Sequence, residues 1–316
     1  MKKGLILSWG RRVPRSSKIA AELHFEELYL INKGKGFFAK IFSYFLNFIK
    51  TCAILSKGDY ERVVLVLPPT LSLYAVPFKH SRTELFFDLH NGVLRAEWGK
   101  WPFLSHLLSK GVTISHNPVI AKKIDTHFKI SSIVLGDPLT ITDSNVPTKT
   151  AFLSSSKLNV LVPLSYAKDE PLDFLLRLVN ENREEINFIL TGKAPVEIIA
   201  SFGSVVTFTG FVDANEYETL LSTVDAVLCL TSDDDIQMCA LVEAISYRRV
   251  VITKDNLLNK SILKSYPSIY LNFERGYKLN KSLDPILTYR SNFDFNKFEN
   301  EYNMERVGIL ESIRNG

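Results

Sequence analysis

Two acidic residues eight positions apart are the most informative chemical feature of the second half of the sequence. Asp235 and Glu243 lie between an apolar strand expected at 225–230 and another at 249–253. On a helix over 236–247, the two carboxylates would be separated by roughly 12 Å. That is about the span from a hexose to a ribose across a diphosphate, and a helix N-terminus favours such an anion. The spacing therefore predicts a site for a diphosphate-linked ligand.

Less specific interpretations of these acids remain open. Asp235 could simply cap the helix, since Asp is a favoured capping residue. Glu243 could be a solvated helix residue, and the run Asp233-Asp234-Asp235 also has the pattern of an acidic metal-binding triplet. Its place before a helix argues against a metal.

A second group of ionisable residues follows a strand in the first half of the sequence. The strand expected over 83–88 runs into Asp88-Leu89-His90-Asn91, and the strand before it ends in Pro68-Pro69-Thr70. Parallel strands present their carboxyl ends at one edge of a sheet, which is where ligands bind. A carboxylate or an imidazole there can take a proton from an attacking hydroxyl group. Asp88 is the first candidate for this base and His90 the second; alternatively, Asp88 only binds a loop and His90 is an interior histidine.

Three arginines crowd the loop after the first strand, in the run Trp9-Gly10-Arg11-Arg12-Val13-Pro14-Arg15. Guanidinium groups pair with phosphate in a bidentate way, so this loop suits a diphosphate-linked acceptor. A solvated basic loop is the alternative. The residues expected to contact the acceptor are Trp9, Gly10, Arg11, Arg12, Arg15 and Asn91.

Residues 37–55 predict a long apolar helix with one narrow polar stripe, formed by Lys40, Ser43, Asn47 and Lys50. The helix is either buried in the first domain or lies in a membrane interface with its lysines near lipid headgroups. Charge favours the membrane: residues 1–145 carry 20 Lys and Arg against 11 Asp and Glu, whereas the remainder carries 18 against 23.

Composition narrows the class of protein. The 316 residues are 46% hydrophobic and 23% charged, which excludes a disordered or low-complexity chain. Three cysteines exclude a disulfide framework. No long uncharged apolar run occurs, so no membrane-spanning helix is predicted. The aromatic residues do not alternate with arginines, which argues against nucleic acid as a partner.

Short apolar strands alternate with helices along the whole chain, which predicts parallel α/β sheets. A Pro-, Thr- and Ser-rich stretch over 136–156 interrupts the alternation and is expected to link two domains. The strands are expected at 3–8, 28–31, 62–67, 83–88, 111–115, 131–135, 158–163, 186–190, 205–209, 225–230 and 249–253, and helices after the linker near 171–181, 214–222, 236–247 and 295–314.

The segment LTSDDDIQMCALVEAISYRRVVITKD resembles the acid-x7-Glu donor-site segment of GT-B fold glycosyltransferases. Asp235 matches the acid that faces the donor sugar, where the family more often has Glu, and Glu243 matches the residue that binds the ribose. The family's small residue and Gly before the last strand are replaced by Tyr247-Arg248-Arg249. By this resemblance, the donor-binding residues are Ser165, Lys168, Gly192, Phe211, Val212, Thr231, Ser232, Asp235 and Glu243.

In the first half, the Pro-Pro turn followed by Asp-x-His-Asn resembles the eukaryotic chitobiosyldiphosphodolichol β-mannosyltransferase group and its bacterial relatives. The two resemblances imply a GT-B α/β fold, with two doubly wound, Rossmann-like domains facing a central cleft. Residues 1–145 would bind the acceptor and 146–316 the donor, with the last helix packing back on the first domain.

The activity implied is transfer of a hexose from a nucleoside-diphosphate sugar to a lipid-linked saccharide acceptor, in surface polysaccharide or glycan synthesis. The acid-x7-Glu helix occurs with retaining chemistry, whereas Asp-x-His-Asn points to inversion, which we favour. A helix N-terminus and Lys168 would stabilise the leaving group, so we expect no metal and no cofactor besides the co-substrate. We expect a cytoplasmic protein, peripheral on a membrane surface. A sugar-nucleotide epimerase of the same fold and a non-catalytic subunit that binds a partner enzyme remain alternatives.

Overall fold

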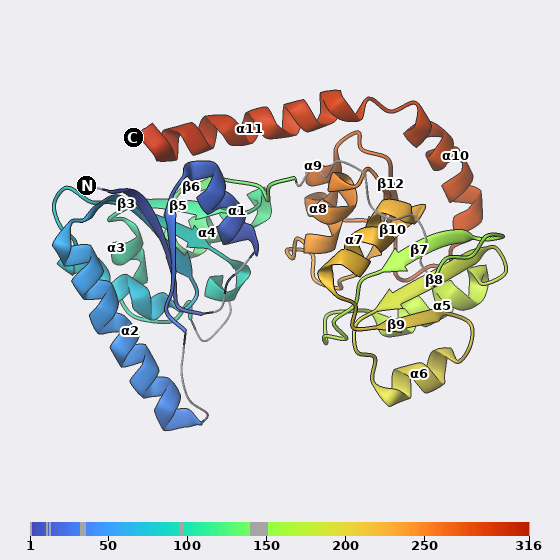
Figure 1. Ribbon diagram of the computed structural model, residues 1–316, viewed down its shortest axis with the longest axis horizontal. Coiled ribbons are helices and arrows are strands. Elements are labelled where there is room, and N and C mark those ends of the chain that lie inside the picture. Colours follow the sequence, from blue (N-terminus) through green and yellow to red (C-terminus); the bar gives the residue numbers. More distant parts are fainter. Residues whose placement is uncertain are drawn as a thin grey trace. The chain divides into compact units, whose positions relative to one another are not determined.

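The computed structural model describes residues 2–10, 12, 14–31, 36–94, 98–139 and 151–315. The chain divides into two compact units (Figure 1): unit 1 is Met1–Pro138 with Tyr302–Gly316, and unit 2 is Leu139–Glu301. The boundary expected after residue 145 falls among residues 140–150, outside the described residues. The final segment returns to unit 1, so unit 1 is built from both ends of the chain.

Unit 1 contains one parallel six-stranded sheet with the strand order β2-β1-β3-β4-β5-β6. The expected α/β class is therefore confirmed for this half. The strands are β1 Lys2–Ser8, β2 Glu26–Tyr29, β3 Tyr60–Leu67, β4 Glu84–Leu89, β5 Val112–Ser115 and β6 Ser132–Val134.

Helices cover both faces of this sheet, so consecutive strand residues are buried on opposite sides. Leu65 and Phe87 pack with α2, α3, α4 and the 3-10 segment η1, whereas Val64 and Phe86 pack with α1 and α11. The helices are α1 Pro14–Leu23, α2 Phe37–Lys57, α3 Leu104–Leu108, α4 Pro118–Phe128 and α11 Phe295–Asn315, with 3-10 segments η1 Thr70–Phe78 and η2 Asn91–Leu94.

Helix α2 faces the sheet with its polar side. Of the two alternatives left open for this helix, burial in the first domain does not hold for most of its apolar side chains. Its buried residues are Ser43, Asn47, Thr51 and Leu55. The Asn47 side chain donates to the Leu30 carbonyl (3.1 Å) and the Trp9 indole to Thr51 Oγ1 (2.9 Å). Seven large apolar side chains of α2 are exposed instead: Phe37, Phe38, Ile41, Phe42, Phe45, Leu46 and Ile49.

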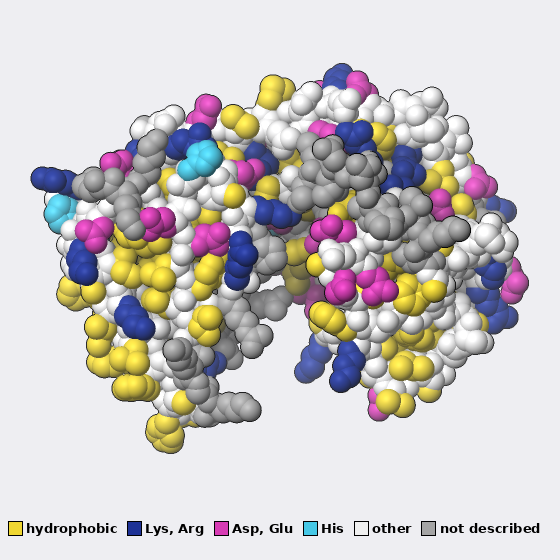
Figure 2. Space-filling model, in the orientation of Figure 1, with side chains coloured by type: hydrophobic (Ala, Val, Ile, Leu, Met, Phe, Trp, Pro, Cys, Tyr) yellow, Lys and Arg dark blue, Asp and Glu magenta, His cyan; other side chains and the backbone are white. Residues whose placement is uncertain are grey.

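These exposed side chains form an apolar face, visible along α2 in Figure 2. By length and composition α2 is apolar enough to cross a membrane, although the sequence led us to expect no such helix. The expectation required a run without charge, and Lys40 and Lys50 interrupt that run.

Unit 2 also contains a parallel six-stranded sheet, with the strand order β12-β11-β10-β7-β8-β9. The sequence interpretation missed its edge strand β12. The strands are β7 Leu158–Val162, β8 Ile186–Thr191, β9 Thr207–Gly210, β10 Ala226–Cys229, β11 Val250–Lys254 and β12 Ser268–Leu271. The helices are α5 Leu172–Asn182, α6 Val196–Phe202, α7 Ala214–Thr223, α8 Cys239–Ser246, α9 Leu257–Leu263 and α10 Leu279–Ser291.

The turn between α8 and β11 lacks the glycine expected before this strand from the resemblance noted above. Arg248 takes a left-handed conformation there (φ 56°), which glycine adopts at lower cost. The Arg248 guanidinium bonds both carboxylate oxygens of Glu299 (3.0 and 2.9 Å) and lies over the Phe295 ring. We infer that these contacts, made by the start of α11, offset the backbone strain at this turn.

Candidate active site

Each sheet has one point where the strand order reverses, between β1 and β3 in unit 1 and between β7 and β10 in unit 2. In doubly wound folds ligands bind beyond the carboxyl ends of the strands at this point. The loops that follow these strands carry most of the residues singled out from the sequence.

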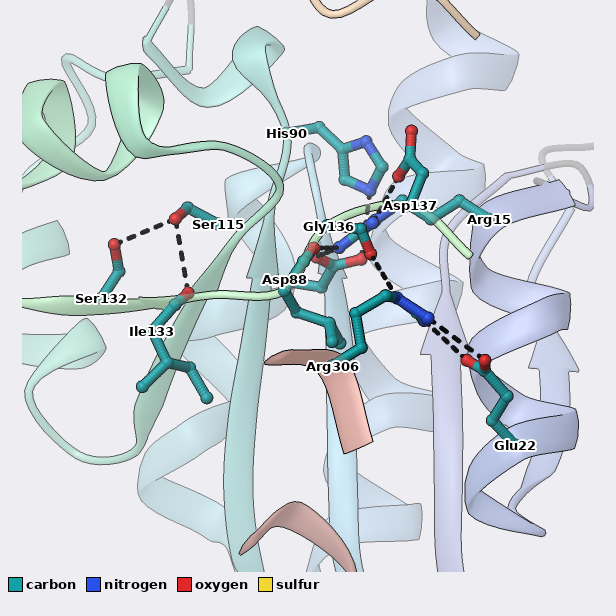
Figure 3. Close-up of polar contacts among 11 residues, drawn as sticks. Arg15, Glu22, Asp88, His90, Ser115, Ser132, Ile133, Gly136, Asp137 and Arg306 are labelled. Atoms are coloured by element: carbon teal, nitrogen blue, oxygen red, sulfur yellow. Dashed lines mark hydrogen bonds and ion pairs between the residues drawn. The ribbon is translucent and has the colours of Figure 1, made fainter. Parts of the chain in front are cut away.

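In unit 1, Asp88 and His90 lie together at the end of β4 (Figure 3). His90 Nε2 is 3.2 Å from Asp88 Oδ2, and Arg15 Nη2 is 3.4 Å from Asp88 Oδ1. Asp88 is 3% exposed, whereas the His90 side chain is 28% exposed. Within the part of the chain that the structure describes, His90 Nδ1 has no hydrogen-bond partner. Nδ1 of His90 is therefore available to a ligand, whereas the Asp88 carboxylate is buried and contacts Nε2.

Burial opposes ionisation of Asp88, but the charges of Arg15 and His90 outweigh it and hold the pKa of Asp88 well below its usual range. A carboxylate with such a low pKa is a weak proton acceptor. It is, however, well suited to fix the orientation of a neighbouring imidazole and to stabilise its protonated form. The geometry reverses our order of candidates, and His90 becomes the better base.

The arginine loop is placed differently from our expectation. Arg15 is buried, with hydrogen bonds from its guanidinium to the Asp137 carboxylate and to the Leu135 carbonyl (2.8 Å). Its charge is used inside the protein, so the expected contact between Arg15 and an acceptor is wrong. Arg12 is largely exposed and donates to Ser17 Oγ (2.7 Å). Arg11 lies outside the described residues.

The other predicted acceptor residues follow strands β1 and β4. Trp9 is buried, Gly10 has open space where a side chain would begin, and Asn91 starts η2 directly after His90. All three follow the carboxyl end of a strand in unit 1. The expected acceptor contacts of Trp9, Gly10, Arg12 and Asn91 therefore remain predictions.

Several residues of the cluster were not foreseen. His116 follows β5, its ring centroid is 5.8 Å from that of His90, and burial lowers its pKa to about 4, helped by Arg15 and His90. From α11, Arg306 donates to the Gly136 carbonyl (3.1 Å) and pairs with Glu22 (2.7 Å), and the Tyr302 hydroxyl donates to the Asp137 carbonyl (2.7 Å). Only His116 had a local signal, its place at the end of a strand.

In unit 2, Thr231 and Ser232 are bound to the loop after β7. Thr231 Oγ1 donates to the Asp169 carboxylate (3.1 Å), and Ser232 donates from its amide (2.7 Å) and hydroxyl (2.9 Å) to the Asp169 carbonyl. Lys254 Nζ reaches the Ser232 carbonyl (2.6 Å) and the Asp234 carboxylate (2.9 Å). These bonds join the loops after β7 and β10 across the switch point.

The loop after β7 also shows how Ser165, Lys168 and Gly192 are used. The Ser165 amide (2.9 Å) and hydroxyl (2.8 Å) both donate to Glu170, so a diphosphate would have to displace that carboxylate. Lys168 is exposed on the same loop. Gly192 has φ 87°, and a Cβ there would lie 2.2 Å from the Leu164 carbonyl oxygen. Only glycine lets the loops after β7 and β8 approach this closely.

Asp235 and Glu243 do not share a helix, and this expectation is wrong. Helix α8 begins at Cys239 with Met238 at its cap position, so Asp235 lies in the preceding turn and is not the N-cap residue of this helix. The bonds of Thr231 and Ser232 hold this stretch against the neighbouring loop, which delays the start of the helix. Glu243 lies on α8 and accepts a hydrogen bond from the Tyr217 hydroxyl (2.8 Å). Burial and the Glu243 carboxylate raise the pKa of Tyr217, which stays a donor.

The turn after β9 places an aromatic side chain in solvent. Gly210 has φ 71°, Phe211 is 88% exposed and Val212 is half-buried. An exposed ring costs hydrophobic free energy unless a ligand covers it. Among the residues that the structure describes, no group of three or more His, Cys, Asp or Glu side chains could hold a metal ion.

Comparison with known proteins gives a likeness in fold. No protein-family model and no curated protein sequence matches the chain. A glycosyltransferase from Rickettsia africae is similar over 100% of this chain and 99% of its own, with a TM-score of 0.71 and 11% identity. Anabaena Alr3699/HepE, solved in complex with UDP and glucose, is similar over 100% of both chains (TM-score 0.71, 12% identity).

A putative UDP-N-acetylglucosamine 2-epimerase from Listeria monocytogenes also matches, over 87% of this chain and 86% of its own, with a TM-score of 0.59 and 12% identity. Identities this low establish the fold and nothing finer. The two parallel sheets and the match along the full chain give this protein the GT-B α/β fold.

Proposed function

We propose that this protein is an inverting, metal-independent glycosyltransferase that moves a hexose from a nucleoside-diphosphate sugar to a lipid-linked saccharide acceptor. The observation that carries the proposal is the pair at the end of β4, in which a buried, ionised Asp88 orients the partly exposed His90. HepE, which is similar in fold, was solved with UDP and glucose, and this makes UDP the first nucleotide to test.

In the proposed reaction, His90 Nδ1 takes the proton of the acceptor hydroxyl as that oxygen attacks the anomeric carbon. The imidazolium that forms is stabilised by Asp88 through Nε2, and Arg15 keeps Asp88 ionised. His116, with its lowered pKa, stays neutral near pH 7 and adds no competing positive charge beside His90.

Unit 2 would bind the donor. Glu243 accepts hydrogen bonds from the ribose while keeping its contact with Tyr217, and Phe211 covers the base. Asp235 faces the sugar, and the amides after β7, together with Lys168, meet the diphosphate. Glu170, which accepts three hydrogen bonds from Ser165 and Ala167, would leave these donors to the phosphate oxygens.

The acceptor side of the proposal includes a membrane surface. The apolar face of α2 is accompanied by three lysines, Lys40, Lys50 and Lys57, and by no carboxylate along the helix. An interfacial helix combines these properties, with apolar side chains among the acyl chains and lysines among anionic headgroups. This would hold the protein at the cytoplasmic face of a membrane that carries the acceptor.

A nucleotide panel tests the donor half. UDP, GDP, ADP, CMP and TDP, each with and without magnesium, are added to the wild type and to Glu243→Ala during thermal unfolding. A ligand that binds only the native state raises the melting temperature by mass action. We expect UDP to give the largest shift, without magnesium, and Glu243→Ala to lose about 1–3 kcal/mol of binding free energy.

The outcome also separates the alternatives. A protein whose melting temperature responds to no nucleotide is better explained as a non-catalytic subunit. Conversion of a UDP-sugar to its epimer without any acceptor would identify the protein as an epimerase. We test this alternative because the putative epimerase from Listeria monocytogenes is similar in fold. Transfer that retains the anomeric configuration would refute the role of His90 as base.

A further inference from the structure

An apolar groove lies between α2 and the loops at the carboxyl ends of β1, β3 and β4. It has a volume of about 450 Å³ and is lined by nine side chains, among them Trp9, Ile41, Tyr44, Trp98 and Trp101. This volume is typical of sites for small organic ligands. The site proposed above does not use the groove, although Trp98 and Trp101 follow β4, the strand that also precedes His90.

Four of the side chains that line the groove form a chain of ring contacts. Trp9 stacks on Tyr44 (6.1 Å between centroids), Tyr44 meets Trp98 edge-on (6.2 Å), and Trp98 stacks on Trp101 (6.4 Å). Contacts among aromatic rings fix the positions of large side chains, so the groove is preformed.

The surface that lines the groove is almost wholly apolar, and two of its polar groups are bonded within the protein. The Trp9 indole donates to Thr51, and the Tyr74 hydroxyl donates to the Pro102 carbonyl. A saccharide in the groove would lose hydrogen bonds to water and find few replacements, which costs free energy for each group. A hydrocarbon chain loses nothing in this way and gains by burial. The lining therefore selects a hydrocarbon.

Positive charges beside the groove indicate which kind of polar headgroup the hydrocarbon chain carries. Lys40 Nζ lies 5.9 Å from the ring centroid of Tyr44, one of the lining residues. Lys100 is exposed and lies in sequence between the lining residues Trp98 and Trp101. These cations complement an anionic group at the end of the chain, such as a phosphate.

We propose that this groove binds the hydrocarbon chain of an anionic, phosphate-bearing lipid, with Lys40 and Lys100 near the phosphate. The proposal rests on the function proposed above, since it names the lipid part of the acceptor. It also separates two roles of α2: Ile41 faces the groove, whereas Phe42, the next residue, does not line it and belongs to the exposed apolar face.

The tryptophans make the test specific. The chain has three, Trp9, Trp98 and Trp101, and all of them line the groove. Dibrominated oleyl phosphate, whose bromine atoms quench indole fluorescence on contact, is titrated below its micelle concentration into the wild type, Ile41→Arg and Phe42→Arg. Both substituted side chains are at least half exposed, so both variants are expected to fold. Unbrominated oleyl phosphate is the control for non-specific changes.

We expect saturable quenching in the wild type and in Phe42→Arg, and an affinity at least about tenfold lower in Ile41→Arg, because a charge would have to be buried in the groove. Dibrominated oleyl alcohol should bind several-fold more weakly than the phosphate. Absence of quenching, an equal loss in both variants, or equal binding of the alcohol and the phosphate would overturn the proposal.

Two further measurements distinguish failure of the groove proposal from failure of the function proposed above. Phe42→Arg should weaken binding to anionic vesicles while leaving oleyl phosphate binding intact. The nucleotide-induced rise in melting temperature should be the same in Ile41→Arg as in the wild type. Lipid binding without any nucleotide response would refute the transferase alone, and a nucleotide response without lipid binding would refute the groove alone.

Discussion

Replacement of Arg15 by Gln should destabilise unit 1 by an amount that depends on pH. The Arg15 side chain is 8% exposed and lies between Asp88 and Asp137, whose side chains are 5% and 17% exposed. Removing one partner of a buried ion pair costs about 3–5 kcal/mol, because the remaining charge has lost its compensation. Asp88 keeps its contact with His90, so we expect about 3 kcal/mol at pH 7.

The pH dependence follows from the pKa of Asp88. In the wild type the pKa of Asp88 is lowered, so ionised Asp88 stabilises the folded state fully above the ordinary pKa of about 3.9. This stabilisation is lost as the pH falls from that value toward the lowered pKa of the folded protein. Arg15 is the charge that lowers the pKa of Asp88 most, ahead of His90 and His116, so we expect this pKa to rise when Arg15 is removed and protonation of Asp88 to stabilise the variant. The difference in unfolding free energy between the two proteins should therefore shrink as the pH falls from 7 to about 5.

Urea unfolding followed by tryptophan fluorescence measures this difference, since all three tryptophans belong to unit 1. Arg12→Gln is the matched control: the Arg12 side chain is 72% exposed, and its loss should cost at most about 1 kcal/mol. A loss below about 1 kcal/mol in Arg15→Gln, or a difference that stays constant from pH 7 to pH 5, would refute the arrangement of charges described here.

Three further predictions concern single side chains. His90→Gln should reduce transfer by about 100-fold or more, in a steady-state assay with donor and acceptor, while nucleotide binding stays intact; unchanged transfer would remove His90 from the mechanism. Phe211→Ala should weaken nucleotide binding by about 1 kcal/mol, measured by calorimetry, with no change in melting temperature, because the ring is exposed. Gly192→Ala should cost about 1–3 kcal/mol of stability, measured by circular dichroism, since its Cβ would collide with the Leu164 carbonyl; a neutral effect would contradict the close approach of the two loops.

The periodic apolar pattern was enough to predict the two α/β sheets and the long helix α2. The pattern could not predict which side of α2 faces the sheet. In most surface helices the polar stripe is turned to solvent, but Asn47 and Thr51 turn inward here because the Leu30 carbonyl and the Trp9 indole provide partners. Those partners lie outside α2, 17 residues from Asn47 and 42 residues from Thr51.

The same reason limits the prediction of the candidate site. Asp88 and His90 are two residues apart on one strand end, so their proximity could be inferred. Arg15 looked like a surface cation because its partner Asp137 is 122 residues away. The start of α8 was placed too early because the bonds of Thr231 and Ser232 to Asp169 override the local preference for helix. Contacts between distant segments leave no local pattern in a single sequence.

The return of residues 302–316 to unit 1 has a consequence for the order of assembly during synthesis. One face of the first sheet packs against Leu310 and Ile313, which leave the ribosome only after the whole of unit 2. At about 5–20 residues per second, residues 139–301 take about 10–30 s to translate. For that time Val64 and Phe86 have no helix α11 to cover them, and Arg306 is not yet present to bind the Gly136 carbonyl. The strands of the first sheet are all made before unit 2, but one face of that sheet stays partly uncovered until α11 has been made, so the nascent first unit exposes apolar surface for the longest time.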